Sequence, residues 1–149
     1  MGTHFVGTAK ENLALDCYVK LFRAADSVGQ RINAHLRDHE LTVSQFGTLE
    51  AIYHLGPMQS GELGHKILKT SGNMTMVIDH LEKRGLVTRQ RRADDRRCID
   101  IHLTQAGSEL IAAILPAHVG GVVETLAPLS TEEQQQLAAL CRKLGLAQG

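Results

Sequence analysis

The apolar residues of this chain change their spacing at Gly85, and that change limits the folds available to it. Before Gly85 they recur every three or four residues, as on one face of a helix. That face consists of Met74, Val77, Ile78 and Leu81. After Gly85, the stretches Leu86 to Gln90 and Cys98 to Leu103 alternate apolar and polar residues, which is typical of strands. The sequence therefore predicts a helix, a left-handed glycine at its end, and a β-hairpin.

Helical spacing predicts five further helices around this unit. They run from Ala9 to about His39, from Thr42 or Ser44 to Leu55, from Ser60 to Leu68, from Thr104 to Leu126 with a bend at Pro116, and from Ser130 to Leu144. Thr70 or Ser71 is expected to cap the helix before Gly85. Ser130 and Glu133 have the spacing of a capping box.

The order of these elements predicts a mainly α fold with a small β-hairpin wing. Two short helices, a third that begins with small polar residues, and a hairpin form the winged helix-turn-helix plan. We expect a single domain over 1–149, with the winged lobe at 41–104. The long helices at 9–39 and 105–146 have apolar faces that this lobe cannot cover, so we expect them to meet a second copy in a two-fold dimer.

Composition indicates a cytoplasmic protein with no membrane segment. The chain has 149 residues, 43% of them hydrophobic but only 3% aromatic, which suits one domain with an aliphatic core. The longest apolar stretch, Leu110 to Val123, falls short of membrane-spanning length, and the first residues lack the apolar centre of a signal peptide. The three cysteines have neither scaffold nor zinc-ribbon spacing, so we expect reduced thiols.

Positive charge is concentrated in one segment of a chain with no net charge. Between Lys83 and Arg97 there are seven basic residues and two acidic ones, so the remainder carries the opposite balance. A local basic cluster on an acidic body predicts contact with phosphate groups. A solvated charged hairpin is the alternative explanation. We found no phosphate loop, nucleophile elbow or supported carboxylate pair, so we expect neither an enzyme nor a cofactor.

The segment SGNMTMVIDHLEKRGLVTRQRRADDRRCIDIHLTQAG resembles the signature region of the MarR family of bacterial transcription regulators. The landmarks LEKRGLV, DDRR and LTQAG occur in the family's order, and LTVSQFGTLEAI and LSTEEQQQL also fall at matching places. The resemblance implies a homodimer that binds double-stranded, pseudo-palindromic operator DNA, and so lies on the nucleoid when bound. It also implies repression that a small phenolic or other apolar ligand, or an oxidant, relieves.

The resemblance and the chemistry of the side chains together give a set of expected DNA-binding residues. They are Ser71, Asn73, Thr75, Met76, His80, Arg89, Arg91, Arg92, Arg96 and Arg97. Asn73 can read adenine with two hydrogen bonds, while Met76 stands where many relatives carry arginine and suggests an apolar contact. Asn73 and His80 could instead be merely solvated, and each arginine could only brace the wing.

Three aspartates are expected to brace the wing rather than touch DNA, because carboxylates repel phosphate. Asp94 and Asp95 would cap its turn and hold the arginine fork. In the family an aspartate often stands at the position of Asp79 and faces the wing, which suggests a tie from Asp79 to Arg96 or Arg97.

The sequence says less about the signal that the protein senses. By resemblance, an effector pocket would lie among the first, second and fifth helices. Cys17, followed by Tyr18, resembles the arrangement in thiol-based peroxide sensors, although an ordinary buried cysteine is the simpler explanation. The histidines His35, His39 and His118 could share a zinc ion. A winged module that binds proteins and not DNA is a further alternative.

Overall fold

The computed structural model describes residues 4–67 and 71–148, and for Ser71 and Gly72 only the backbone. The predicted caps Thr70 and Ser71, and Leu68 at the end of the preceding helix, therefore lie outside the described residues or side chains. The chain forms two compact units. One is His35–His118, and the other combines Met1–Ala34 with Val119–Gly149. The winged lobe expected over 41–104 lies inside the first unit.

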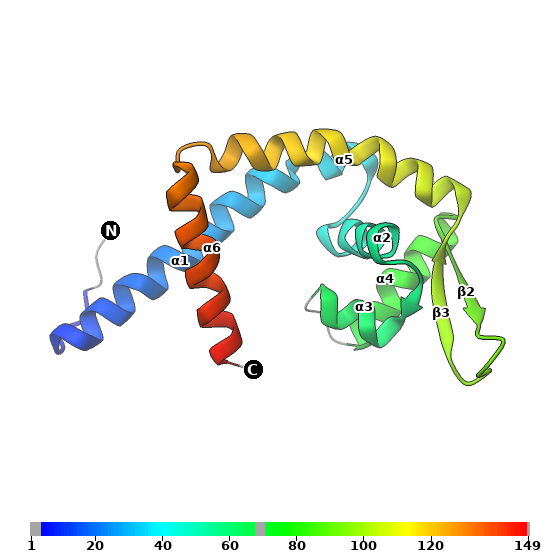
Figure 1. Cartoon of the computed structure of the whole chain (residues 1–149), viewed down its shortest axis with the longest axis horizontal. Helices are drawn as coiled ribbons and strands as arrows, with labels where there is room; N and C mark the ends of the chain where they lie inside the picture. Colours follow the sequence, from blue (N-terminus) through cyan, green and yellow to red (C-terminus); the bar gives the residue numbers. More distant parts are fainter. Residues whose placement is uncertain (1–3, 68–70, 149) are drawn as a thin grey trace. The chain divides into compact units, whose positions relative to one another are not determined.

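The unit His35–His118 combines helical segments with a small sheet. Its elements are the 3-10 helix η1 (Ala34–His39), α2 (Val43–Leu55), β1 (Met58–Gln59), α3 (Ser60–Lys66), α4 (Ser71–Lys83), β2 (Val87–Arg91), β3 (Ile99–Leu103) and the first part of α5 (Gln105–Leu126). The β2–β3 hairpin extends away from α2, α3 and α4 (Figure 1). This arrangement confirms the winged helix-turn-helix plan.

The sheet has one strand more than the sequence predicted. Its order is β1-β3-β2, and both pairs of strands are antiparallel. In β1, Met58 pairs with Ile101 and Gln59 with Asp100. Two residues are too few to show an alternating pattern, so β1 could not be recognised from the sequence. It fixes the middle of β3 against the segment between α2 and α3.

The core of this unit is aliphatic, as the composition predicted. Its fully buried side chains include Leu36, Leu49, Leu63, Met74, Ile78, Leu81, Ile101, Ile111 and Ile114. Three of these belong to the predicted apolar face of α4, and the fourth residue of that face, Val77, is half-buried. Each fully buried side chain contributes about 1.5–3 kcal/mol relative to its exposed state. This burial fixes which face of α4 is left for solvent.

The helices α4 and η1 each end at a residue with left-handed backbone, and the side chain of Arg84 links these two helix ends. Gly85, with φ 72°, ends α4, while Glu40, with φ 54°, ends η1. The Arg84 guanidinium donates to the carbonyl oxygens of Glu40 at 2.8 Å and His39 at 3.1 Å. Arg84 belongs to the basic segment of the sequence, yet it joins the end of α4 to the turn before α2.

The LTQAG motif has a structural role at the start of α5. The Thr104 hydroxyl donates to the Gly85 carbonyl at 2.6 Å and accepts from the Gly107 amide at 3.0 Å, so Thr104 caps α5 as predicted. A side chain at Gly107 would overlap the carbonyl oxygen of Leu86. Thr104 and Gly107 together hold α5 against the start of β2.

The unit formed by Met1–Ala34 and Val119–Gly149 consists of helices. It contains α1 (Ala9–Asn33), the end of α5, and α6 (Thr131–Ala147), which begins with the predicted Ser130 and Glu133 capping box. The expectation of one helix from Ala9 to about His39 was wrong. The α-helix ends at Asn33, and the tighter 3-10 turns of η1 follow, carrying Leu36 into the core of the other unit.

Helix α5 is longer than the apolar stretch that suggested it, and it continues through Pro116. By length and composition alone it could cross a membrane, a property that it shares with core helices of soluble proteins. Its residues Gly107, Ile111 and Ile114 are buried in the unit His35–His118. Packing against protein therefore accounts for the apolar character of its first half.

Candidate nucleic-acid interface

The exposed face of α4 carries the predicted reading residues. Asn73, Thr75, Met76 and His80 are all exposed, and Met76 keeps 61% of its surface. The side chain of Ser71, predicted to join them, lies outside the described part. One edge of this face borders a groove against α2, lined by Thr42, Ser44, Gln45, Asn73, Met76, Val77 and His80. The face is thus polar with one large apolar side chain, a composition that suits base edges and thymine methyl groups.

Asp79 of α4 holds the wing, but through a different arginine from the one predicted. Arg89 of β2 donates to the Asp79 carboxylate at 2.6 Å and to the Glu82 carboxylate at 2.7 Å. Burial disfavours the charge of Arg89, but these hydrogen bonds outweigh it and raise its pKa. The expectation that Asp79 pairs with Arg96 or Arg97 was therefore wrong, because Arg89 occupies this carboxylate. Both of those residues lie beyond the end of β2, whereas Arg89 lies within it.

Arg92 has a second bracing role, at the beginning of the wing's turn. Its guanidinium donates twice to Asp100 of β3, at 2.8 and 2.9 Å, and lies 3.9 Å from the Glu62 carboxylate of α3. The Arg92 guanidinium lowers the pKa of Asp100, and Asp100 in turn raises that of Arg92. Arg92 thus joins both strands of the wing and approaches α3. It was predicted as a DNA contact, and the structure gives it this bracing role.

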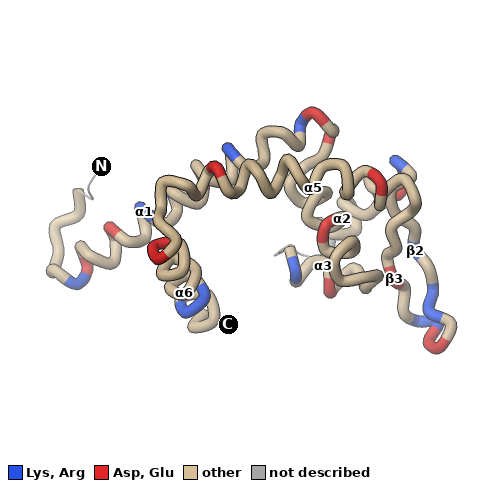
Figure 2. The backbone as a smooth tube through the Cα atoms, turned by 45° about the horizontal axis from the view of Figure 1, so that its top comes forward, with Lys and Arg blue, Asp and Glu red and all other residues tan. Residues whose placement is uncertain are grey.

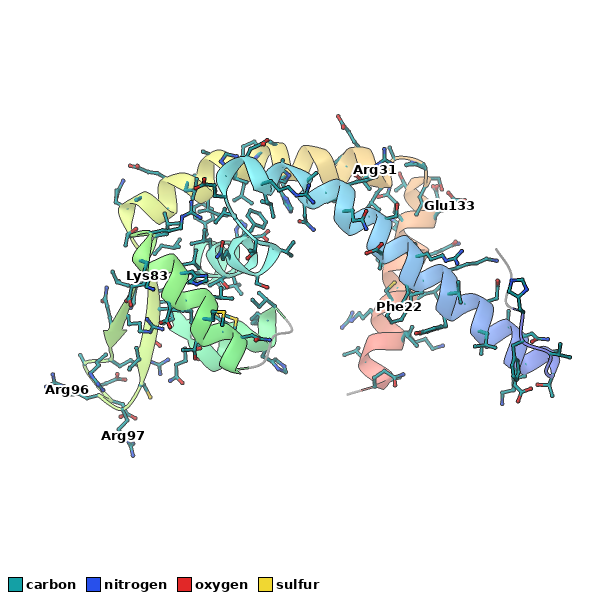
Figure 3. The ribbon with its side chains drawn as sticks, turned by 180° about the vertical axis from the view of Figure 1, so that it is seen from behind. Phe22, Arg31, Lys83, Arg96, Arg97 and Glu133 are labelled. Carbon is teal, nitrogen blue, oxygen red and sulfur yellow. The ribbon has the colours of Figure 1, made fainter. Side chains whose placement is uncertain are left out.

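The remaining arginines lie at the wing's tip, where basic and acidic residues alternate (Figure 2). Arg96 and Arg97 extend outward from it (Figure 3). Among the described residues, the Arg97 side chain is held by Asp95 alone, at 3.1 and 3.2 Å, and it remains 92% exposed. Arg91 donates to the Arg96 carbonyl at 2.9 Å. Arg96 itself forms no ion pair with any residue that the structure describes.

The two adjacent aspartates in the wing differ in their roles. Asp95 accepts from the Arg97 amide at 3.1 Å and from its guanidinium, and Arg97 lowers the pKa of Asp95. The Asp95 carbonyl also accepts from the Cys98 amide at 3.0 Å, which closes the turn. Asp94 makes no hydrogen bond within the described residues. The predicted capping and arginine-holding role therefore belongs to Asp95 alone.

The residues proposed for metal or redox chemistry lie elsewhere. The His118 ring packs between His35 at 5.3 Å and Phe46 at 4.5 Å, centroid to centroid, and His39 is not part of this stack. Among the described residues, no three His, Cys, Asp or Glu side chains are placed to bind a metal ion. Cys17 is exposed on α1, contrary to the simpler expectation of a buried cysteine. It lines an apolar groove of about 580 Å³ between α1 and α6.

Sequence reasoning missed the acidic partners of the wing, Glu82 and Asp100. Two signals could have revealed them. Glu82 is three residues after Asp79, so both carboxylates lie on one face of α4. Asp100 pairs directly with Gln90 across the hairpin, which places it diagonal to Arg92. Without the register of the strands, the sequence does not tell whether Glu82 and Asp100 pair with an arginine or face solvent.

Comparison with known proteins agrees with this arrangement. Residues 41–99 match the MarR family. The HTH-type transcriptional regulator YkoM of Bacillus subtilis is 34% identical over 133 residues, which cover 89% of this chain and 86% of that protein. A mutant of Escherichia coli MarR, solved with operator DNA, has a TM-score of 0.78 at 23% identity and covers 89% of this chain and 96% of its own.

A third similar protein, Bordetella bronchiseptica BpsR, is described in connection with regulation of its DNA binding by 6-hydroxynicotinic acid. It has a TM-score of 0.78 at 22% identity and covers 97% of this chain and 98% of its own. A winged lobe braced in this way, the family match over that lobe and a relative aligned over most of both chains lead to one conclusion. The chain belongs to the MarR family, whose members are DNA-binding transcriptional regulators and not enzymes.

Proposed function

We propose that the protein is a homodimeric repressor that binds a pseudo-palindromic operator and is released by a small apolar or phenolic ligand. One observation supports the DNA-binding part of this proposal. Arg89 is held by carboxylates of α4, and Arg92 by Asp100 of β3 with Glu62 of α3 nearby, whereas Arg96 and Arg97 extend from the wing's tip. A braced hairpin that displays two arginines suits contact with phosphates or a narrow minor groove.

In this proposal α4 enters the major groove, and Asn73 reads a base. Thr75 and His80 contact phosphates or base edges, and Met76 contacts a thymine methyl. Ser71 precedes Asn73 at the start of the same helix. Arg91 contributes charge near the turn. The solved complex of the mutant Escherichia coli MarR with operator DNA supports a DNA-bound form for this fold.

The proposal of a dimer rests on uncovered apolar residues in the unit of α1 and α6. They include Leu13, Tyr18, Phe22, Val119, Val123, Leu137, Leu140 and Leu144, and Leu140 keeps 64% of its surface. Apolar faces of this extent mark association surfaces. A second copy would cover them, and its two-fold symmetry would place two reading helices on a two-fold operator.

The effector class is proposed from similarity and from chemistry. BpsR is described as regulated by 6-hydroxynicotinic acid, a small hydroxylated ring, which supports a ligand of that kind. Cys17 supplies the second candidate, a thiol-based sensor of peroxides. It is exposed and lines a groove with Tyr18 and Phe22, whose rings lie 4.8 Å apart. We place the protein in the cytoplasm, on the nucleoid when it is bound.

A gel-shift series with the DNA upstream of the protein's own gene tests this function. We expect binding at nanomolar concentration, competed weakly by random duplex and weakened by salt. Adding phenols, a peroxide or zinc separately should identify which chemical class of effector releases the protein from the DNA. If no duplex is bound even at low salt, the winged unit is a protein-interaction module and the proposed function is wrong.

A further inference from the structure

The 3-10 helix η1 ends at a strained residue. Glu40 has φ 54°, and among the described residues it is the only one other than glycine with a positive φ. A residue with a side chain is disfavoured in this left-handed region, because its Cβ lies too close to the following carbonyl oxygen. Such a conformation persists only where the surrounding structure holds it. The turn at Glu40 therefore needs a stabilising contact.

Arg84, at the end of α4, supplies this contact. Its guanidinium donates to the carbonyl oxygen of Glu40 at 2.8 Å and to that of His39 at 3.1 Å. Within the part that the structure describes, Arg84 forms no ion pair with a carboxylate. Both of its acceptors belong to the backbone, so Arg84 fixes the path of the chain and not the position of a side chain.

The two helix ends that Arg84 joins have the same backbone hydrogen bonds. In each, the amide of the left-handed residue donates to the carbonyl three residues earlier, and the next amide donates to the carbonyl five residues earlier, at 2.9 or 3.0 Å. This is the Schellman motif, in which glycine usually occupies the left-handed position. Helix α4 has Gly85 there, whereas η1 has Glu40. The end of η1 thus depends on Arg84 in a way that the end of α4 does not.

The turn at Glu40 also determines how the chain enters α2. Leu41, which follows it, is buried in the core, and Thr42 caps α2. The first turn of α2 and the exposed face of α4 line the same groove, of about 310 Å³, in which Thr42 lies with Asn73 and His80. If the turn at Glu40 changed, the beginning of α2 would therefore shift against the face of α4 that is proposed to read DNA.

We infer that Arg84 is a positioning residue for DNA recognition and not a phosphate contact. By holding the left-handed turn at Glu40, it keeps α2 and the exposed face of α4 in the arrangement that fits the operator. This rests on the proposed function, because α4 is the helix proposed to read bases. It distinguishes Arg84 from Arg96 and Arg97, although all three belong to the same basic segment.

The two roles differ in their effects on DNA binding. Loss of a phosphate contact weakens binding to any duplex and reduces the slope of log affinity against log salt. A displaced reading helix instead loses contacts to base edges, which only the operator offers in the right order, and a two-fold operator loses them in both half-sites. The ratio of operator affinity to random-duplex affinity therefore separates positioning from phosphate contact.

Arg84→Ala in the full-length protein tests the inference. We expect the operator-to-random affinity ratio to fall about three- to tenfold, with the salt slope on random duplex as in the wild type. Lys83→Ala removes the same charge one residue earlier, also from an exposed position, and should keep the wild-type ratio. Equal losses on both duplexes with a smaller slope would make Arg84 a phosphate contact. A lower melting temperature with an unchanged ratio would make it structural only, and either result overturns the inference.

Glu40→Gly provides a second test, because glycine adopts the left-handed conformation without the help of Arg84. Added to Arg84→Ala, it should restore most of the operator preference, whereas it could not replace a phosphate contact. Arg84→Lys should keep part of the preference, since one ammonium group can donate to both carbonyl oxygens. No restoration by Glu40→Gly would contradict the positioning role.

The failures of the two proposals can be told apart. If the wild type binds no duplex, the proposed function fails, and this inference fails with it. If the wild type prefers the operator and Arg97→Ala weakens binding, but Arg84→Ala keeps the wild-type ratio, only the positioning role of Arg84 fails.

Discussion

Arg89 of β2 bridges two carboxylates of α4, reaching Asp79 at 2.6 Å and Glu82 at 2.7 Å. Asp79 and Glu82 are one helical turn apart, so a single guanidinium fixes the wing against α4. The Arg89 backbone amide also donates to Glu82 at 3.2 Å. The direction of the wing is therefore set by α4, the same helix that carries the residues proposed to read DNA.

The bridge predicts that Arg89 acts through structure. Arg89→Ala should lower the free energy of unfolding by about 1 kcal/mol, a modest value because all three side chains are partly exposed. Arg89→Lys should restore only part of this, since one ammonium group cannot bridge both carboxylates in the same way. Urea unfolding of the wild type and both variants measures these free energies. Unchanged stability together with a smaller salt dependence of DNA binding would instead make Arg89 a direct contact.

Arg96 and Arg97 should behave as direct DNA contacts. Arg97→Ala should weaken binding to operator and random duplex alike, and should reduce the slope of log affinity against log salt by about one for each phosphate that is no longer neutralised. Arg96→Ala should act in the same direction. Fluorescence anisotropy at several salt concentrations measures both, with circular dichroism to check folding. Unchanged affinity and slope in both folded variants would show that the wing's tip does not touch DNA.

Asn73 should determine specificity and not overall affinity for DNA. Asn73→Ala should remove about 1–3 kcal/mol of discrimination at one base step of each half-site, because two hydrogen bonds to one base are removed. The salt slope should stay as in the wild type, since no cation is removed. Binding to operators substituted at single positions measures this. Equal losses on operator and random duplex would assign Asn73 to the phosphates.

His118 predicts a pH dependence of stability. Burial lowers its pKa below 6.5, and His35 lowers it further while Glu50 opposes the shift. The unfolded chain then binds this proton more readily than the folded protein, so His118 costs no stability above about pH 6.5 and destabilises the fold as the pH falls below it. His118→Phe should reduce the fall in melting temperature between about pH 7 and pH 5. If the melting temperatures of the wild type and of His118→Phe fall equally between these pH values, the prediction is contradicted.

The apolar residues of α6 should be needed for association. Deleting residues 130–149 removes Leu137, Leu140 and Leu144, and the shortened protein should either lose the dimer or aggregate. Light scattering at micromolar concentration measures this. Leu140→Glu is a milder test of the same face and should shift the full-length protein toward monomer. A wild type that is itself a stable monomer would contradict the proposed dimer.

The sequence by itself determined the local elements, because their signals lie within a few neighbouring residues. The capping box at Ser130, Thr42 as one of two candidate caps of α2, the left-handed Gly85 and the change of spacing after it all depend on residues close together in the chain. Helical periodicity predicted the apolar face of α4, and the opposite face was thereby predicted to be exposed. The family could also be recognised from the order of its landmarks.

Tertiary structure decided which charged residues are structural. Seven basic residues between Lys83 and Arg97 look alike in the sequence, but strand register and helix packing give Arg84, Arg89 and Arg92 partners from other elements. Those pairings depend on distances between segments far apart in the chain, which no local pattern specifies. The same holds for the strand β1 and for the groove that joins the first turn of α2 to α4. Residues whose partners are local could be predicted, and residues whose partners come from packing could not.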